Sequence, residues 1–277
     1  MKILIIGASS YVGARLYVDL NKKYDVIGTY HGNKLFKELV KLNITNKIEV
    51  NNIISKYKPD IIIQIAANAR SKWCEDNPNL AIALNQEATQ NIVNAANSNK
   101  SKLYFISSFA AINPNNLYGE TKYKSEQYVK KVKKGYIILR PSLIIGYSPN
   151  TTNDRPFNRI LKNLDNKTEA VYDTSWKFQP SSLSHLLKVI SEVIDRNIIN
   201  ETITVTVKEL KSRYDIAKDI LSPFNIEVSP IDLKDSTPIT TDNLDSLKNL
   251  HLPTCSYSKM ISEIVAEIKN RDKFKII

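Results

Sequence analysis

Cysteine and histidine are scarce in this chain of 277 residues. The two cysteines, Cys74 and Cys255, lie far apart and form no Cys-x-x-Cys pair, and the three histidines are scattered along the sequence. This usage argues against a disulfide framework and against a thiolate or zinc centre, so we predict no metal site. Two isolated thiols are typical of a reducing compartment, and we expect a cytoplasmic protein.

Long apolar runs are missing as well. No stretch approaches the ~20 apolar residues that a membrane-spanning helix needs, and the run at residues 3–6 is too short for the core of a signal peptide. Hydrophobic residues make up 42% and charged residues 24% of the chain, which is typical of a soluble globular protein. We therefore predict no membrane partner, and a buried first strand at residues 2–6.

Acidic residues are too few to balance the basic ones, and the formal net charge is +11. Nucleic-acid-binding proteins usually concentrate such an excess in one stripe or patch. Here it is spread along the chain, with one short cluster at residues 130–134. That cluster ends a predicted helix, where cations complement the helix dipole. We predict no nucleic-acid partner, although a diffuse positive field would help to attract a phosphorylated small molecule.

Short apolar runs alternate with amphipathic stretches in the first 150 residues. The runs predict strands at residues 2–6, 25–30, 60–65, 103–107 and 135–140, and the stretches predict helices at 13–22, 50–57, 80–97 and 118–132. Nearly continuous apolar strands separated by helices indicate a parallel sheet that is covered on both faces. We predict an α/β fold with a Rossmann-type, doubly wound parallel sheet and right-handed crossovers.

Residues 151–277 lose this rhythm and are richer in Pro, Asn, Asp and Ser. A strand is predicted at residues 201–207, and helices at 183–195, 208–221 and 256–270. We expect a smaller C-terminal α/β lobe that binds the substrate. It would be interleaved with the dinucleotide-binding domain of residues 1–150 rather than independent of it.

A glycine-containing turn follows the first strand and opens the first helix. Glycine lets the backbone turn tightly and approach a pyrophosphate, whose charge then meets the helix N-terminus. Serine stands where the usual pattern has its middle glycine, and it is small and can donate a hydrogen bond. A plain structural turn is the alternative. The predicted dinucleotide contacts here are Gly7, Ser9, Ser10, Tyr11, Val12 and Gly13.

The end of the second predicted strand lacks the Asp or Glu that would bind a ribose 2′-hydroxyl. Thr29, His31 and Lys34 stand there instead, and they could accommodate a 2′-phosphate. We predict that NADP(H) is the preferred cofactor and that NAD(H) is also allowed. The alternative is that these are merely loop residues.

Tyr118 and Lys122 carry the predicted chemistry. On a helix, residues four apart share one face, and an ammonium there lowers the pKa of a tyrosine from its usual ~10. The phenol could then pass a proton to a carbonyl oxygen at neutral pH. The preceding strand ends in Ser107 and Ser108, at the edge where ligands bind such sheets, so a hydroxyl there could polarise the same carbonyl. A surface tyrosine beside a salt-bridging lysine is the alternative.

These residues together resemble the extended short-chain dehydrogenase/reductases, and within them the sugar-nucleotide 4-keto reductases of the dTDP-4-dehydrorhamnose reductase type. The resemblance runs through nearly the whole chain. Its motifs are the turn 7–13, the strand end 28–31, the segments 59–63 and 66–69, Asn85, the strand 105–108, the helix start 114–122, the strand end 139–142 and the segment 243–248.

The resemblance implies a role for each matching residue. Tyr118 would be the general acid, Lys122 its pKa-lowering partner, and Ser108 would polarise the C4 carbonyl of the sugar. Hydride would come from the nicotinamide. Besides the glycine turn, the implied cofactor contacts are Tyr30, His31, Asn43, Ile44, Ala66, Ala67, Asn68, Asn85, Tyr118, Lys122, Pro141 and Ser142. The implied substrate contacts are Phe157, Arg159 and residues 179–181, although Arg159 is equally well explained as a helix-surface arginine.

Three features depart from the family pattern. Ser10 replaces the middle glycine, and Asn43 replaces an aspartate that in relatives often approaches the adenine; asparagine can still hydrogen-bond there. Ser108 and Tyr118 are also separated by fewer residues than in the reductases. The missing loop normally helps to frame the substrate, which implies a more open pocket and a different sugar.

Three functions remain open at this point. The first is NAD(P)H-dependent reduction of a nucleotide-linked 4-keto-6-deoxy sugar, as in dTDP-rhamnose biosynthesis, by an oxidoreductase that could form a homodimer. The second is a sugar-nucleotide epimerase or dehydratase that keeps NAD bound, although Phe109 and Ala110 offer no extra acid–base groups for a dehydratase. The third is a non-catalytic regulatory subunit resembling the β subunit of methionine adenosyltransferase. The short loop favours that subunit, whereas the intact Ser108, Tyr118 and Lys122 argue against it.

Overall fold

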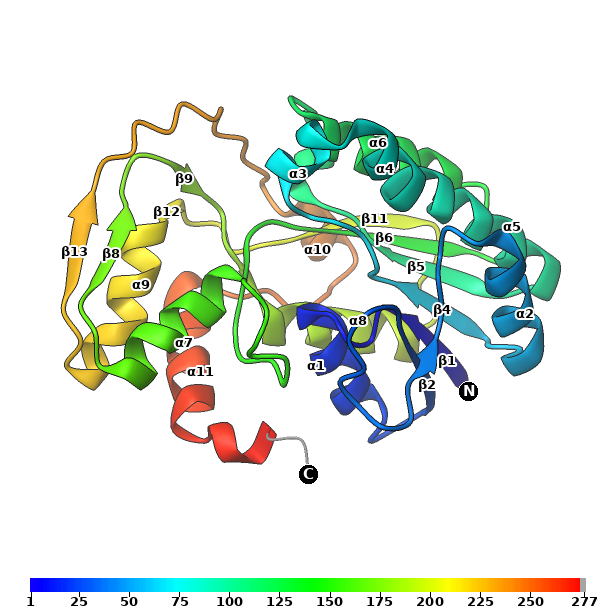
Figure 1. The fold of residues 1–277 in the computed structure, drawn as a ribbon, viewed down its shortest axis with the longest axis horizontal. Helices are drawn as coiled ribbons and strands as arrows, with labels where there is room; N and C mark the ends of the chain where they lie inside the picture. The colour runs from blue at the N-terminus through cyan, green and yellow to red at the C-terminus, as the bar shows by residue number, and fades with distance from the viewer. Residues whose placement is uncertain (275–277) are drawn as a thin grey trace. The chain divides into compact units, whose positions relative to one another are not determined.

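Two compact units make up the chain in this computed structural model, which describes residues 1–274. Unit 1 is Met1–Arg140 with Ser191–Ile203, and unit 2 is Pro141–Ile190 with the described chain from Thr204 onward. Figure 1 labels their helices and strands. Within the described chain, no helix combines the length and the apolar character needed to cross a membrane.

A seven-stranded sheet forms the centre of unit 1, in the order β11-β6-β5-β4-β1-β2-β3. Every pairing from β3 to β6 is parallel. The chain order reverses at β1, which is the arrangement of a doubly wound Rossmann fold, so the predicted fold class is confirmed. The strands are β1 (Lys2–Ile6), β2 (Asp25–Tyr30), β3 (Val40–Lys41), β4 (Ile61–Gln64), β5 (Lys102–Ile106), β6 (Tyr136–Pro141) and β11 (Glu201–Val205).

Side-chain caps determine where the helices of unit 1 begin. The Oγ of Ser10 accepts a hydrogen bond from Gly13 N at 3.1 Å, and Asn46 and Asn116 cap α2 and α6 in the same way. Each cap satisfies an N–H group that has no partner within the first helical turn. The first helix therefore begins at Tyr11 rather than at the predicted residue 13. The helices are α1 (Tyr11–Leu20), α2 (Lys47–Tyr57), α3 (Ser71–Asp76), α4 (Pro78–Ala81), α5 (Ala88–Asn99) and α6 (Leu117–Val129), with the 3-10 turn η2 (Phe109–Ala111).

The predicted single helix over residues 80–97 is wrong. The chain forms α4, then a π-helical segment η1 (Ile82–Glu87), and only then α5. At the junction Ala88 N donates to Ala83 O, five residues back, instead of four. Apolar periodicity shows that a segment is helical, but it does not show an inserted residue of this kind, and such π-bulges are frequent at functional sites.

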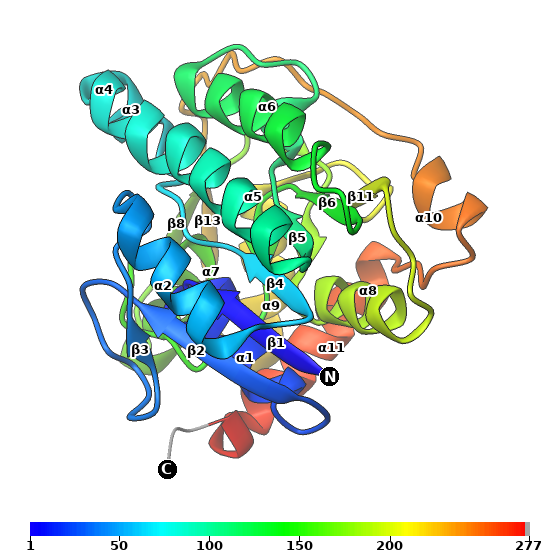
Figure 2. The same ribbon diagram turned by 90° about the vertical axis from the view of Figure 1, so that its right-hand side faces the viewer.

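Strands and helices of unit 1 share an apolar core. Leu4, Ile6 and Ile62 of the sheet pack with Val50 of α2 and Ile92 of α5. Figure 2 shows α2, α5 and α6 side by side over this face of the sheet. Because strand side chains alternate between the two faces, a strand buried on both faces reads as continuously apolar, as β1 and β4 do. Each such side chain stabilises the fold by roughly 1.5–3 kcal/mol.

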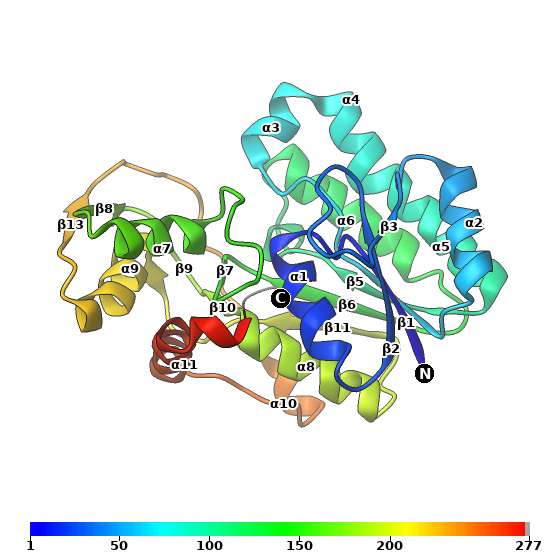
Figure 3. The ribbon, with the colours of Figure 1, turned by 60° about the horizontal axis from the view of Figure 1, so that its bottom comes forward.

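Unit 2 contains short strands and helices. Two-stranded pairings join β10 to β7, β12 to β9 and β13 to β8, and Figures 1 and 3 show β8 and β13 beside α9. The elements are β7 (Ile144–Ile145), α7 (Pro156–Asn166), β8 (Ala170–Asp173), β9 (Lys177–Phe178), β10 (Ser181–Ser182), α8 (Leu183–Asp195, which continues into unit 1), β12 (Lys211–Ser212), α9 (Arg213–Leu221), η3 (Ser222–Phe224), β13 (Val228–Ile231), α10 (Asp245–Asn249), α11 (Tyr257–Lys269) and η4 (Arg271–Phe274).

One sequence expectation for this unit is corrected, and one helix was not expected. The helix predicted at 208–221 begins only at Arg213, because Ser212 and Asp215 form a reciprocal capping box and Lys211–Ser212 pairs with β9 as a strand. The helix α7 was not predicted, although proline at its first position is a common start signal.

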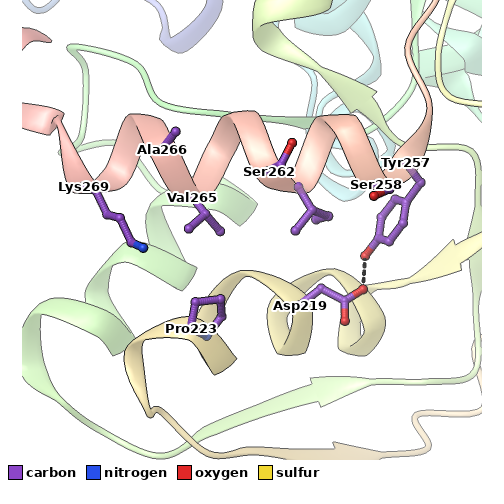
Figure 4. A pocket seen from close by; sticks show the side chains of 9 residues that line it. Asp219, Pro223, Tyr257, Ser258, Ser262, Val265, Ala266 and Lys269 are labelled. Carbon is purple, nitrogen blue, oxygen red and sulfur yellow. Dashed lines mark hydrogen bonds between the residues drawn. The ribbon is translucent and has the colours of Figure 1, made fainter.

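A hollow on unit 2 lies between α9 and α11 and is shown in Figure 4. Tyr257 Oη donates to Asp219 Oδ2 at 2.7 Å across it, and burial together with this bond raises the pKa of the phenol. The hollow is lined by Asp219, Pro223, Tyr257, Ser258, Ile261, Ser262, Val265, Ala266 and Lys269. None of these is a predicted site residue, and the predicted glycine turn and catalytic pair belong to unit 1.

Candidate active site

The turn between β1 and α1 is too tight for side chains at Gly7 and Gly13. A Cβ on Gly13 would lie 2.1 Å from Gly7 O, a Cβ on Gly7 would lie 2.9 Å from Ala66 N, and Gly7 has a φ of +97°. Gly7 N also donates to Thr29 Oγ1 at 3.2 Å. The turn thus places bare main chain against the end of β4, at the point where the strand order reverses and ligands bind such sheets. A dinucleotide pyrophosphate fits a cradle of this kind.

Ser10 does more than replace a glycine. Its Oγ accepts from Gly13 N, so the side chain caps α1, and this bond leaves its hydroxyl hydrogen available for donation. Ser9 Oγ accepts from Leu35 N at 3.3 Å, which ties the turn to the loop after β2. Tyr11 is buried, so its side chain serves the core of unit 1.

Asn85 fixes the segment that follows β4. Its side chain accepts from Asn68 N at 2.8 Å and donates to Asn68 O at 3.0 Å. Its own carbonyl oxygen, on the π-helical segment, accepts from Thr89 Oγ1 at 3.0 Å and from Ser125 Oγ of α6 at 2.7 Å. Asn85 therefore connects the predicted cofactor segment 66–68 to the helix of the predicted catalytic pair.

Lys122 is almost fully buried, with 3% of its surface exposed. Its Nζ donates to Ile106 O at 2.8 Å and lies 4.5 Å from the centroid of the Phe105 ring. Burial lowers the pKa of the amine from 10.5 to about 8, while the Glu126 carboxylate opposes this change. The ammonium form still dominates at pH 7. Because Ile106 ends β5, the charge is held at the carboxyl edge of the sheet, and the alternative of a surface lysine does not apply.

Ser108 and Tyr118 lie on the two elements that flank the short loop, and both are half-buried. Ser108 caps η2, with its Oγ accepting from Ala110 N at 3.2 Å. η2 packs closely on the first turn of α6, where a Cβ on Gly119 would lie 2.7 Å from Ala110 O. This close approach lets a short connection suffice. The structure thus places Ser108 and the Lys122 ammonium at the end of β5, and the first turn of α6, which carries Tyr118, against η2.

A buried ion pair next to Lys122 was missed by the sequence analysis. Glu126, fully buried on α6, accepts from Arg140 Nε at 2.9 Å and from Arg140 Nη2 at 2.5 Å. Ser107 Oγ donates to the same carboxylate at 2.6 Å. The only signal in the sequence is the spacing of four residues from Tyr118 to Lys122 and again to Glu126, which places all three on one helix face.

Residues that were assigned to the adenosine end lie on or after β2. Lys34 Nζ lies 5.6 Å from the centroid of the Tyr30 ring, and residues 31–34 contain no acid. Asn43 Oδ1 accepts from Thr45 N at 3.1 Å and from Thr45 Oγ1 at 2.8 Å, so its oxygen is used locally. Ile44 is 5% exposed and belongs to the core. Their contacts with a cofactor stay predictions.

Other predicted residues belong to unit 2. Ser142 N donates to Ser181 Oγ at 2.8 Å, next to Pro141 at the end of β6. The Gln179 amide donates to the main-chain carbonyls of Lys208 and Asp242. Phe157 is fully buried in α7, and Arg159 pairs with Asp154. These contacts are internal to unit 2, and the implied nicotinamide and substrate roles of these residues stay predictions.

Comparisons with known proteins cover nearly the whole chain. Residues 1–260 match the RmlD substrate binding domain family. The chain is similar to methionine adenosyltransferase 2 subunit beta of Xenopus laevis, with 24% identity over 280 residues, which covers 94% of this chain and 81% of that protein. It is also similar to the capsular polysaccharide biosynthesis protein CapD of Staphylococcus aureus, with 26% identity over 151 residues, 52% of this chain and 24% of that protein.

Solved structures share the fold. The dTDP-4-dehydrorhamnose reductase of Clostridium acetobutylicum superimposes with a TM-score of 0.81 at 24% identity, covering 97% of this chain and 100% of that one. The Bacillus anthracis enzyme in complex with NADP gives 0.80 at 22% identity, with 97% and 98% covered. WbmG of Bordetella bronchiseptica in complex with NAD gives 0.79 at 14% identity, with 98% and 94% covered.

Two of these neighbours were solved with NADP and with NAD, and the family match confirms the expected resemblance to the dTDP-4-dehydrorhamnose reductase type. The family match spans most of the 277 residues and includes both the glycine turn and the buried lysine. The chain therefore belongs to the RmlD substrate-binding domain family.

Proposed function

We propose that this protein reduces a 4-keto group on a nucleotide-linked deoxy sugar with NADPH. The observation that carries the proposal is the buried Lys122 ammonium, fixed on Ile106 O one helical turn after Tyr118. A buried charge is costly unless it is hydrogen-bonded or paired, and the Ile106 carbonyl supplies such a bond to Lys122 at the ligand-binding edge of the sheet, two residues before Ser108. Such a cluster is suited to protonating a carbonyl oxygen.

The proton step follows from the charges of these residues. An ammonium near a phenol stabilises the phenolate that forms when Tyr118 gives up its proton. Tyr118 would donate that proton to the carbonyl oxygen of the substrate, and the Ser108 hydroxyl would hydrogen-bond the same oxygen while negative charge develops on it. Lys122 would keep its own proton and act through its charge.

The dinucleotide would be held by residues of the turn and by the ends of β2 and β4. The bare main chain at Gly7 and Gly13 fits a pyrophosphate, and the loop of residues 31–34 carries basic and neutral groups suited to a 2′-phosphate. When bound, the nicotinamide would supply the hydride that reduces the carbonyl carbon. Relatives solved with NADP and with NAD support a nicotinamide cofactor, and the absence of an acid in the loop after β2 favours NADPH.

The substrate class is supported by the family and by charge. The net charge of +11 favours a ligand that carries a diphosphate. The close packing of η2 on Gly119 leaves a short connection between Ser108 and Tyr118, in place of the loop that frames the sugar in the reductases. We infer that the sugar differs from dTDP-4-dehydrorhamnose. We also infer that the protein is cytoplasmic and that it binds neither nucleic acid nor a membrane.

One assay tests this function. The protein is mixed with NADPH and, separately, with each member of a panel of nucleotide-linked 4-keto sugars, and the absorbance of the reduced nicotinamide is followed. We expect consumption with at least one sugar and none without it. If calorimetry shows NADPH bound but no sugar is reduced, the reductase proposal is wrong.

A regulatory subunit is the second candidate, because curated relatives include methionine adenosyltransferase 2 subunit beta. The same assay separates the two functions. A protein that binds NADPH, reduces no 4-keto sugar and changes the kinetics of a methionine adenosyltransferase catalytic subunit would be a regulator. An epimerase would instead interconvert sugar isomers with NAD retained and with no net consumption of cofactor.

A further inference from the structure

Three ionisable or phenolic side chains follow one another along α6. Tyr118, Lys122 and Glu126 are spaced by four residues, so they share one face of the helix. Lys122 is 3% exposed and Glu126 is fully buried, so water contributes little to the solvation of either charged group. A buried amine and a buried carboxylate one turn apart influence each other more strongly than the same pair at the surface.

Glu126 is held from two strands at once. Ser107 Oγ of the β5 end donates to Oε1 at 2.6 Å, and Arg140 of β6 donates to both carboxylate oxygens. Ser107 directly precedes Ser108, and Lys122 Nζ donates to Ile106 O, directly before Ser107. The end of β5 is therefore fastened to α6 at two consecutive residues, Ile106 and Ser107, directly before Ser108.

The charges that face Lys122 come from several elements. Glu126 on α6 favours the charged amine, and the buried thiol of Cys74 on α3 does so to a smaller extent. Tyr118 lies one turn before it on the same helix. β5 contributes the uncharged Ile106 O and the face of the Phe105 ring. Arg140 pairs with the Glu126 carboxylate, and among residues 1–274 no carboxylate lies within ion-pair distance of Lys122 Nζ.

We propose that Glu126 is a positioning residue for the reduction. It keeps the Lys122 ammonium charged, and it holds the end of β5 that leads to Ser108 in place against α6, the helix of Tyr118. The inference rests on the proposed function for its catalytic meaning, although its effect on Lys122 does not depend on any substrate. The alternative is that Glu126 only neutralises the charge of Arg140 and has no effect on Lys122.

The consequence for pH follows from the sign of the charge. Burial already lowers the pKa of Lys122 to about 8, and the Glu126 carboxylate opposes a further fall. Removing that negative charge should lower the pKa by roughly one pH unit or more. At pH 7.5 a fall of about one unit, from about 8, would cut the charged fraction about threefold. The alkaline limb of turnover would then move to lower pH.

The test titrates Lys122 directly. Protein labelled with ¹³C,¹⁵N-lysine is titrated from about pH 6 to pH 10 by NMR, with the Lys122 signal assigned from its loss in Lys122→Met, and the midpoints are compared with reference values. We expect Glu126→Gln to lower the midpoint, Arg140→Gln to leave it unchanged or raise it, and Glu126→Asp to restore most of the wild-type value. Glu263→Gln, which removes the partner of Lys188 in unit 2, is the matched control and should leave it unchanged.

A lowered midpoint in Glu126→Gln together with an unchanged or raised midpoint in Arg140→Gln supports the proposal. A merely structural pair would loosen in both variants and lower both midpoints, which would overturn it. An unchanged or raised midpoint in Glu126→Gln overturns it. The pH profile of turnover is then measured on any 4-keto sugar that the wild type reduces. A shifted midpoint with no reducible sugar would refute the proposed reductase but not the assignment of Glu126, whereas turnover with an unshifted midpoint would refute the assignment alone.

Discussion

Replacing Lys122 with methionine should abolish reduction while making the fold no less stable at neutral pH. The amine is 3% exposed, and its pKa falls from 10.5 to about 8. Since each pKa unit corresponds to about 1.4 kcal/mol, holding the charged amine in the fold costs roughly 3 kcal/mol at pH 7. Methionine removes this cost but leaves Ile106 O without its donor, which costs about 1–3 kcal/mol. We expect a small net gain, on the order of 1 kcal/mol.

The pH dependence is the sharper part of this prediction, and its sign follows from linkage. Folded Lys122 loses its proton near pH 8 and unfolded lysine near pH 10.5. Between these values the unfolded state binds more protons, so wild-type stability rises with pH relative to a variant that lacks the amine. The advantage of Lys122→Met is complete below pH 8 and should shrink by roughly 3 kcal/mol as pH rises to 10.5.

Urea unfolding measures this difference. In a Trp176→Phe background the fluorescence of Trp73 reports on unit 1 alone, because the chain has two tryptophans and Trp73 lies in that unit. Lys124→Met, an exposed position on the same helix, is the matched control and should change stability by less than about 0.5 kcal/mol at every pH. A stability difference between Lys122→Met and wild type that stays constant from pH 8 to pH 10 would refute the assigned burial of the charge.

Three further predictions concern binding and turnover. Gly13→Ala should lose dinucleotide binding in calorimetry and at least about 1–3 kcal/mol of stability, because its Cβ would lie 2.1 Å from Gly7 O. Gly32→Ala, with nothing near its Cβ, is the control for stability and should unfold in urea as wild type does. Tyr118→Phe should lower turnover about 10²–10⁴-fold with NADPH affinity nearly intact, and wild-type turnover in this variant would exclude Tyr118 as the acid. NADPH should bind more tightly than NADH; calorimetry showing the reverse would remove the argument from the loop after β2.

Local patterns were enough to predict the parallel sheet and most of its helices. The strand at residues 25–30 and the helix at 183–195 coincide with β2 and α8, because apolar runs and amphipathic periodicity depend only on neighbouring residues. The glycine turn was recognisable for the same reason, since a tight strand–turn–helix junction places its demands on residues 7–13 themselves.

Tertiary structure alone decided the environment of the candidate site. The pairing of Glu126 with Arg140 and the bond from Ser107 to the same carboxylate join separate elements, and Lys122 is buried where they meet. The four-residue spacing along α6 places Lys122 and Glu126 on one helix face, but it reveals neither these partners nor the burial. The same holds for Asn85, whose carbonyl is shared between α5 and α6 at a π-helical segment. Neighbouring residues determine whether a segment is a helix or a strand, whereas the pKa of a side chain depends on the charges and the solvent that distant segments bring to it or keep from it.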